Sequence, residues 1–385
     1  MSQKNSKVGF KDIDSKSLSE INNILHEDDI TPVSNKEINF ETEVYSGLKL
    51  FNFEYDELPK LLDPIFPKVG LASLVGSSDT GKSTFLRQLA LSIALGIDDF
   101  VGYTISPKNN KVIFISTEDD PASTSISIKK PIKQLIKDNN ADIQSLNNIK
   151  FIFEVETNPK SPKNIFTKLD KDISKTPVDL IVVDAFTDIF SGDINSSTKV
   201  REFLNQFSII AKKHNCLVLF LHHTGKKTHK FSASKDNVLG SQAFEAKMRV
   251  LIELKQFPND ETLRTLTITK GNYISSQIKK FTKILKFDED SLLFSYTGKK
   301  VLSDSIASLA YTNPKKDEIL EIIKKLHKEK KSIRIITSEL KKLGHQIGKS
   351  TVANYINEIK AKEPIKTKIE IEPEPTNSDK SEFTL

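Results

Sequence analysis

The nine residues from Gly76 to Thr84, GSSDTGKST, constrain this 385-residue chain more than any other segment. They meet the pattern G-x-x-x-x-G-K-[ST], in which backbone N–H groups of a glycine-rich loop and of a helix N-terminus surround phosphate groups. Such a loop needs a buried strand before it and a helix after it. Residues 70–75 form a short apolar run, and apolar residues recur at helical spacing from 85 to 94, so both elements are predicted.

We therefore predict that this loop binds the phosphates of a nucleotide. Lys82 is expected to neutralise phosphate charge, and the Ser83 hydroxyl is expected to bind Mg²⁺. The alternative is a chance match to the pattern, which the predicted strand and helix make less plausible. The candidate binding residues are Gly76, Ser77, Ser78, Asp79, Thr80, Gly81, Lys82, Ser83 and Thr84.

Four further apolar runs have the length of buried strands. They occupy 112–115, 151–153, 180–183 and 217–221, and an amphipathic helical pattern at 200–211 separates the last two. Apolar strands separated by helices are typical of a mostly parallel sheet covered on both faces, so we predict an α/β fold. The pattern changes between 248 and 296, where we expect antiparallel strands that close one edge of the sheet.

Composition excludes several classes of protein. No apolar run approaches 18 residues and no charged-then-apolar leader is present, which argues against a membrane span or a secretory signal. We expect a soluble cytoplasmic protein without a membrane partner. The single cysteine, Cys216, begins an apolar run, so it is expected to pack in the core and can support neither a disulfide framework nor a cysteine-based zinc site.

Two acidic residues follow predicted strands at positions that suit phosphate chemistry. Asp184 ends the run LIVVD and is the candidate for holding the metal and its water shell. Glu118, in the segment STEDD after the strand at 112–115, is the candidate for polarising an attacking water. The simpler alternatives are an aspartate that only ends a strand and an acidic turn.

The order of motifs along the chain resembles a known family. GSSDTGKST is followed by ISTEDDP, LIVVDAF, DINSS, FLHHTGKK, GSQAFEAKMR and TKGNY. This order, over about residues 60–300, is similar to that of the RecA-like P-loop ATPases that include hexameric plasmid replication helicases of the RepA type. The resemblance implies a RecA-like fold, hydrolysis of ATP with Mg²⁺, and assembly as a homo-oligomer, with a hexamer as one candidate.

The same resemblance implies two further site residues. In the family a His or Gln at a strand end reports the state of the γ-phosphate, and His223 matches it, with His222 beside it; a metal-binding histidine pair and polar capping are the alternatives. A basic residue that reaches the neighbouring subunit's site corresponds to Lys270, although many relatives have arginine there. Arg249 is the second candidate, and a surface lysine is the simpler interpretation of Lys270.

The segment TKLD at 167–170 spells the guanine-recognition motif of GTPases but precedes the metal-binding strand. Apolar residues at helical spacing surround it. We interpret it as a helix surface, so ATP is preferred over GTP.

A basic segment follows residue 314, and its apolar residues recur at helical spacing in three short pieces. Residues 315–362 carry 13 Lys or Arg and 6 Asp or Glu, a net charge of +7, whereas the whole chain has +6. Residues 332–344 and 347–356 resemble a helix-turn-helix with a glycine in its turn. A DNA partner is therefore expected, with a protein-docking bundle as the alternative. The residues left to face DNA are Lys349, Ser350, Thr351, Asn354 and Asn357.

These observations predict four regions and one leading function. The regions are a flexible arm at 1–45, a RecA-like ATPase domain at 46–300, a helix-turn-helix domain at 313–362 and a disordered tail at 363–385. The function is a DNA-associated ATPase of the replicative-helicase or mobile-element replication type. The alternative is a DNA-binding regulator that ATP controls and that turns over little.

Overall fold

The computed structural model describes residues 44–53, 55, 57–225, 233–234, 242–257, 260–306, 314–345, 347–361 and 370–371. The chain divides into two units, Met1–Leu58 and Pro59–Leu385. The arm predicted at 1–45 falls outside the described residues except for 44 and 45. The tail predicted at 363–385 also falls outside them, apart from 370–371.

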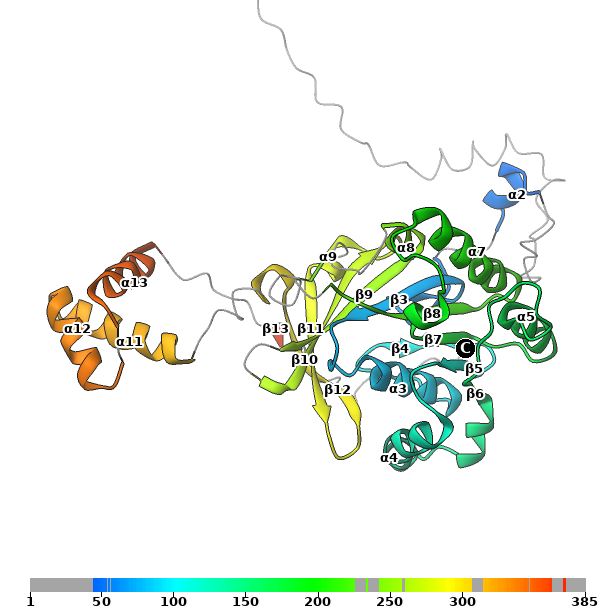
Figure 1. Cartoon of the computed structure of the whole chain (residues 1–385), viewed down its shortest axis with the longest axis horizontal. Coiled ribbons are helices and arrows are strands. Elements are labelled where there is room, and N and C mark those ends of the chain that lie inside the picture. The colour runs from blue at the N-terminus through cyan, green and yellow to red at the C-terminus, as the bar shows by residue number, and fades with distance from the viewer. Residues whose placement is uncertain are drawn as a thin grey trace, which may run out of the picture. The chain divides into compact units, whose positions relative to one another are not determined.

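A ten-stranded sheet forms the centre of the second unit (Figure 1). Its strand order is β13-β12-β11-β10-β9-β3-β8-β7-β5-β6, and the six strands from β9 to β6 are parallel. The five apolar runs that predict strands are confirmed as β3, β5, β6, β7 and β8. The bounds are β3 Gly70–Gly76, β5 Val112–Ser116, β6 Ile149–Ile152, β7 Leu180–Asp184, β8 Leu217–His223, β9 Val250–Phe257, β10 Asp260–Gly271, β11 Phe281–Asp288, β12 Leu293–Leu302 and β13 Glu370–Ile371.

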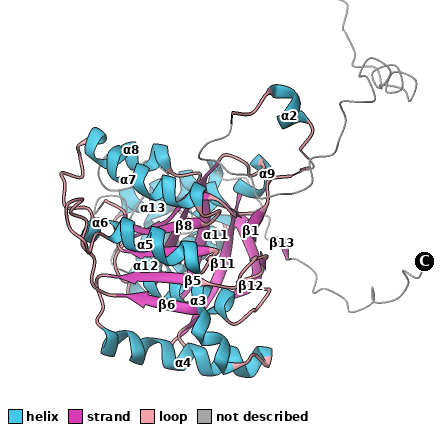
Figure 2. Cartoon of the chain, turned by 90° about the vertical axis from the view of Figure 1, so that its right-hand side faces the viewer, coloured by secondary structure: helices cyan, strands magenta, loops and turns pink. Residues whose placement is uncertain are grey.

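Helices cover both faces of the parallel strands (Figure 2). Successive strand residues point to opposite faces, so Leu74 joins one apolar cluster and Val75 the other. The first cluster includes apolar residues of α3, which packs against α4; the second includes those of α5, α6, α7 and α8. The bounds are α3 Lys82–Ala94, α4 Pro121–Asn139, α5 Ile165–Lys175, α6 Phe186–Ile189, α7 Ser197–Lys213 and α8 Gln242–Lys247.

The expectation that all strands between 248 and 296 are antiparallel is wrong for the first of them. β9 runs parallel to β3 and antiparallel to β10. The long connection from the end of β8 through α8 returns the chain to the opposite end of the sheet, which is the crossover that a parallel neighbour requires. β10, β11 and β12 then follow as the antiparallel strands expected.

Smaller elements complete the described structure. A three-stranded sheet has the order β2-β1-β4. The single cysteine, Cys216, is buried directly before β8, and this burial raises the pKa of its thiol to about 12. That environment confirms a core role for the cysteine. The remaining bounds are β1 Lys60–Asp63, β2 Phe66–Pro67, β4 Thr104–Ile105, α9 Ser276–Lys279, the 3₁₀ helices η2 Ile143–Asn148 and η5 Ser303–Ser305, and, in the first unit, α2 Gly47–Phe51.

The three helical segments predicted after residue 314 are present. They are α11 Pro314–Lys328, α12 Ile333–Lys342 and α13 Lys349–Ala361. Their apolar faces form a small core of their own, made of Ile319, Ile323, Ile336, Leu340, Val352 and Ile356. Among the described residues, no helix combines the length and the apolar character that crossing a bilayer demands.

Candidate active site

The predicted phosphate-binding loop joins the end of β3 to the start of α3. Gly81 precedes the helix with φ +86°, a left-handed conformation that glycine adopts without steric cost, and the N–H of Phe85 donates to its carbonyl at 2.9 Å. Ser78 and Asp79 are exposed at the tip of the loop. The first N–H groups of a helix lack partners within it, so the start of α3 can donate to an anion.

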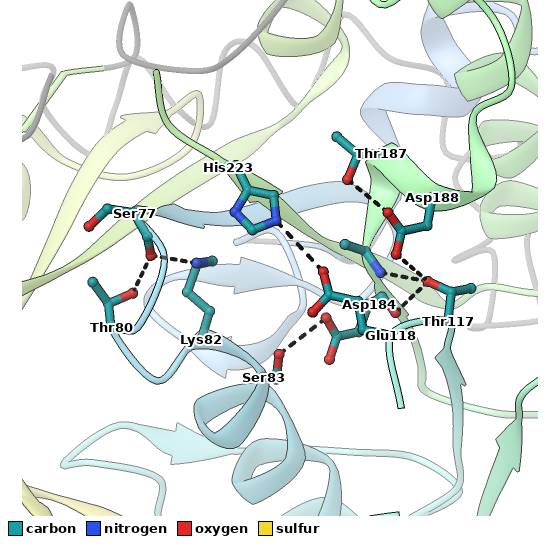
Figure 3. A network of polar contacts seen from close by, with 11 residues as sticks. Ser77, Thr80, Lys82, Ser83, Thr117, Glu118, Asp184, Thr187, Asp188 and His223 are labelled. Atoms are coloured by element: carbon teal, nitrogen blue, oxygen red, sulfur yellow. Dashed lines mark hydrogen bonds and ion pairs between the residues drawn. The ribbon is translucent and has the colours of Figure 1, made fainter. Parts of the chain in front are cut away.

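Lys82 lies buried beneath this loop. Its Nζ donates to the carbonyl of Ser77 at 2.6 Å, and the Thr80 hydroxyl donates to the same oxygen at 3.0 Å (Figure 3). Burial lowers the pKa of the Lys82 amine, while the negative charges of Glu118, Asp184 and Asp79 oppose that shift. A phosphate group at the loop would offer the amine a stronger, charged acceptor.

Asp184 ends β7 and is almost fully buried, with 1% of its surface exposed. The hydroxyl of Ser83 donates to its Oδ1 at 3.2 Å, which brings the two predicted metal-binding residues together. Burial raises the pKa of the Asp184 carboxyl to about 6, against the hydrogen bond from Ser83 and the positive charge of Arg87. Ionisation of the Asp184 carboxyl is therefore unfavourable unless a cation approaches it.

The donor atoms at this point fit a magnesium ion. Mg²⁺ prefers oxygen ligands and keeps several waters, so it typically binds through one or two protein oxygens together with substrate phosphates. The Ser83 hydroxyl and the Asp184 carboxylate supply such oxygens at the start of the phosphate loop. Within the described residues, no group of three or more His, Cys, Asp or Glu is arranged to hold a metal without such help.

Glu118 lies two residues beyond β5 and faces the same site (Figure 3). β5 and β7 are neighbours, with Ser116 opposite Asp184, so the two strand ends bring both acidic residues to one edge of the sheet. Oε1 of Glu118 is 3.7 Å from Nε2 of His223, the last residue of β8. The side chain of Glu118 is 45% exposed, which leaves it accessible to water.

The two adjacent histidines have different environments. His223 is partly exposed and faces Glu118, whereas His222 is fully buried, with its ring centroid 5.1 Å from that of Phe186 and 4.4 Å from that of Phe244. Adjacent residues of a strand point to opposite faces of the sheet. The alternative in which both histidines hold one metal ion is therefore wrong.

Among the described residues, the two candidates for a trans-acting cation do not contact the phosphate loop or the acidic residues beside it. Nζ of Lys270, on β10, is 2.9 Å from Oε1 of Glu245 and donates to the backbone carbonyl of that residue at 2.7 Å. The guanidinium of Arg249 lies 5.9 Å from the ring centroid of Tyr273. In the described part of the chain, neither side chain is hydrogen-bonded to the phosphate loop.

Several residues that organise the site belong to none of the sequence motifs. Thr117 donates from its hydroxyl toward the carbonyl of Asp184 at 2.9 Å or the Asp188 carboxylate at 3.0 Å, and accepts from the N–H of Ala185 at 3.1 Å. Arg264 of β10 donates to the carbonyl of Thr80 at 3.1 Å. These contacts join segments far apart in sequence, and local patterns carry no signal for them.

Arg87 forms an ion pair with Asp119, the residue after Glu118. This contact has a weak sequence signal, because Arg87 is the only charged residue in the run 85–94 that predicts α3. Arg87 belongs to none of the motifs.

The TKLD segment lies on α5, as predicted. Asp170 is at the helix surface, where it contacts Lys213 at 3.0 Å and His214 at 2.7 Å, and these hydrogen bonds lower the pKa of its carboxyl. An aspartate engaged in this way on the helix surface supports the interpretation that the segment is not a base-recognition loop.

Comparisons with known proteins identify the family of the domain that contains the site. The profile of the AAA domain family matches residues 37–229, half of the chain, and this segment includes the phosphate loop, Glu118, Asp184 and His223. Lys270 and the C-terminal helices lie outside the matched segment. No curated protein matches the chain in sequence.

A solved structure of an ATPase domain is similar at a TM-score of 0.43 and 14% identity, over 59% of this chain and 84% of that one. Similarity at this level says nothing about function. The parallel strand order, with β8 between the phosphate-loop strand β3 and the Asp184 strand β7, gives a RecA-like core. The family match and this core together show that the chain belongs to the AAA domain family of P-loop ATPases.

Proposed function

We propose that this protein hydrolyses ATP with Mg²⁺ as a DNA-associated, homo-oligomeric ATPase of the replicative-helicase or mobile-element replication type. One observation carries the proposal of hydrolysis: Ser83 contacts Asp184 at 3.2 Å while Glu118 faces His223 at 3.7 Å, at the mouth of one phosphate loop. Nucleotide binding alone would require the loop but not the second pair.

Each residue has a role that its position supports. Residues 76–84 bind the phosphates through backbone N–H groups, and Lys82 offsets their charge. Ser83 and Asp184 are the protein oxygens toward Mg²⁺, which when bound supplies charge neutralisation between the phosphates. Glu118 accepts the proton of the attacking water, and His223 contacts Glu118 so that it can respond to loss of the terminal phosphate.

A homo-oligomer supplies the trans-acting cation. Lys270 is the first candidate for this role and Arg249 the second, and a hexamer is the proposed assembly. Lys270 is paired with Glu245 and its side chain is 18% exposed, so it has to leave Glu245 to reach the site of a neighbouring copy.

The C-terminal helices supply the DNA contact, as a helix-turn-helix in which α13 faces the duplex. Their exposed surface supports this assignment. Lys349, Ser350 and Asn354 are exposed near the start of α13, and Thr351 is partly exposed, whereas Val352 and Ile356 turn inward. The net charge of +7 favours contact with phosphates. Asn357 belongs to α13, but its side chain lies outside the described residues.

A regulator that binds DNA under the control of ATP, with little turnover, is the second candidate function. The exposed Asn354 favours it, because an amide near the start of such a helix can read base edges of duplex DNA. Translocating helicases grip single strands, so duplex readout is the property that separates the two proposals.

The test is ATPase activity of the full chain with no DNA, single-stranded DNA and duplex DNA, together with a strand-unwinding assay. Glu118→Gln should bind ATP normally and lose turnover by about 10²-fold or more, because only the proton acceptor is removed. Glu154→Gln is the matched control, an exposed glutamate two residues beyond the neighbouring strand β6, and should leave turnover unchanged. A Glu118→Gln rate within about twofold of wild type would exclude Glu118 as the base.

A further inference from the structure

The segment Thr117–Asp120 contains three consecutive acidic residues, and the structure separates them. Asp120 is the N-cap of α4 and accepts from the N–H of Ser123 at 2.7 Å. Asp119 is ion-paired with Arg87 on α3. Only Glu118 faces His223 and the phosphate loop. Its two neighbours are therefore both engaged elsewhere.

Arg87 is placed on the same helix face as the metal-binding serine. Residues four apart lie on one face of a helix, so Ser83 and Arg87 both point from α3 toward the strand ends. Ser83 contacts Asp184 at the end of β7, and Arg87 contacts Asp119 beyond the end of the neighbouring strand β5. One face of α3 thus contacts both acid-bearing segments.

The other side of Glu118 is anchored as well. The backbone N–H of Thr117 donates to the carbonyl of Asp184 at 2.8 Å, and the Thr117 hydroxyl contacts the Asp188 carboxylate at 3.0 Å. The residue before Glu118, Thr117, is therefore hydrogen-bonded to the end of β7, and the residue after it, Asp119, is ion-paired with α3. The backbone position of Glu118 relative to the phosphates depends on these two anchors.

Arg87 is a costly way to stabilise this part of the fold. Its side chain is only 10% exposed, and in the described part of the chain its Nε has no hydrogen-bond partner. Apolar residues that replace a buried ion pair are often neutral or stabilising for the fold. A guanidinium retained here, opposite the residue next to the base, is better explained by a demand for position than by stability.

We propose that Arg87, through Asp119, is a positioning residue that holds Glu118 at the phosphate loop. This inference rests on the proposed role of Glu118 as the base. It predicts that the ion pair acts on turnover more than on nucleotide binding, since neither Arg87 nor Asp119 belongs to the phosphate loop. It also predicts that the two residues act as one unit. Because the charge of Arg87 also acts on Asp184, Asp119→Asn, which keeps that charge, is the variant that isolates the ion pair.

The experiment measures kcat, KM and the affinity for a fluorescent ATP analogue in full-length Arg87→Met, Asp119→Asn, the double variant and Arg87→Lys. Each single variant should lower kcat by about tenfold or more, because a displacement of the base by an ångström is costly, with nucleotide affinity within about threefold. The double variant should lose no more than either single one, and it should unfold near the wild-type temperature. Arg87→Lys should recover part of the loss.

Asp170→Asn is the matched control, because it removes an ion pair with Lys213 between two helices on the opposite face of the sheet and should leave kcat unchanged. Additive losses in the double variant, a wild-type kcat in the single variants, or a loss confined to nucleotide affinity would each overturn the proposal. If Arg87→Met does not fold, Asp119→Asn gives the same test, since that side chain is one-third exposed. Absence of turnover in the wild type would instead refute the proposed hydrolysis.

Discussion

Asp184 is a single residue whose charge opposes the folding of the nucleotide-free protein. Burial raises the pKa of its carboxyl from 3.8 to about 6, so the protonated form is favoured in the folded state. The contribution of the protonated Asp184 carboxyl to the free energy of unfolding is complete below pH 4 and is lost as the pH rises through 6. Near pH 8 the folded protein keeps an ionised carboxylate in a site that water barely reaches.

Asp184→Asn should therefore stabilise the protein without nucleotide at pH 8, by about 3 kcal/mol, and the gain should disappear near pH 4. Thermal unfolding of both proteins across this range measures it. Mg²⁺-dependent ATP binding should weaken in the same variant, because an amide is a poorer metal ligand than a carboxylate. Asp138→Asn, an exposed position, is the control, and a stability difference that does not change with pH would contradict the explanation.

Residue patterns predict the central part of this site and not its supports. Lys82 and Ser83 follow from the loop motif, and the order of motifs correctly brings Glu118, Asp184 and His223 to one edge of the sheet. The sequence does not distinguish the roles of Glu118, Asp119 and Asp120. These three consecutive acidic residues have three different partners in the structure. The partners, Arg87 above all, are fixed by how α3 crosses the strands, and local patterns do not contain that information.

At the scale of elements, the C-terminal helices are predictable because each has its own apolar periodicity and they share a core. The direction of one strand in the sheet, β9, is not predictable in this way. The apolar content of β9 predicts a strand, but its direction depends on the connection through α8, and residues 226–232 and 235–241 of that connection carry no strong pattern. The same strand pattern is compatible with either direction.

The α13 element gives a prediction about DNA. Lys349→Ala should weaken binding to all duplexes alike and reduce the slope of log affinity against log salt by about one unit, because one phosphate contact is lost. Titrations at several salt concentrations measure the slope. Lys133→Ala on α4 removes an exposed cation from the core domain and serves as the control. An unchanged slope in the Lys349 variant would favour a helical bundle that docks protein.

At the scale of the whole molecule, the proposed oligomer predicts complementation between defective subunits. Lys270→Ala should be inactive alone, and mixing it in equal amounts with Glu118→Gln should restore about a quarter of the sites, those in which an intact base meets an intact neighbouring lysine. Turnover of the mixture, measured after subunit exchange, tests this. A partner that carries both substitutions should restore nothing. If the first mixture also stays inactive, Lys270 acts within its own chain or only at the surface.

The placement of Ser83 and Arg87 on α3 also limits how the chain can change length. Four residues make about one helical turn, so both side chains leave α3 on the same face and contact Asp184 and Asp119. An insertion of one residue between Ser83 and Arg87 would rotate Arg87 by roughly 100° away from the β5 end while Ser83 stayed in place. Surface loops commonly accept added residues, whereas the four-residue spacing of Ser83 and Arg87 is fixed by the two acidic residues that they contact.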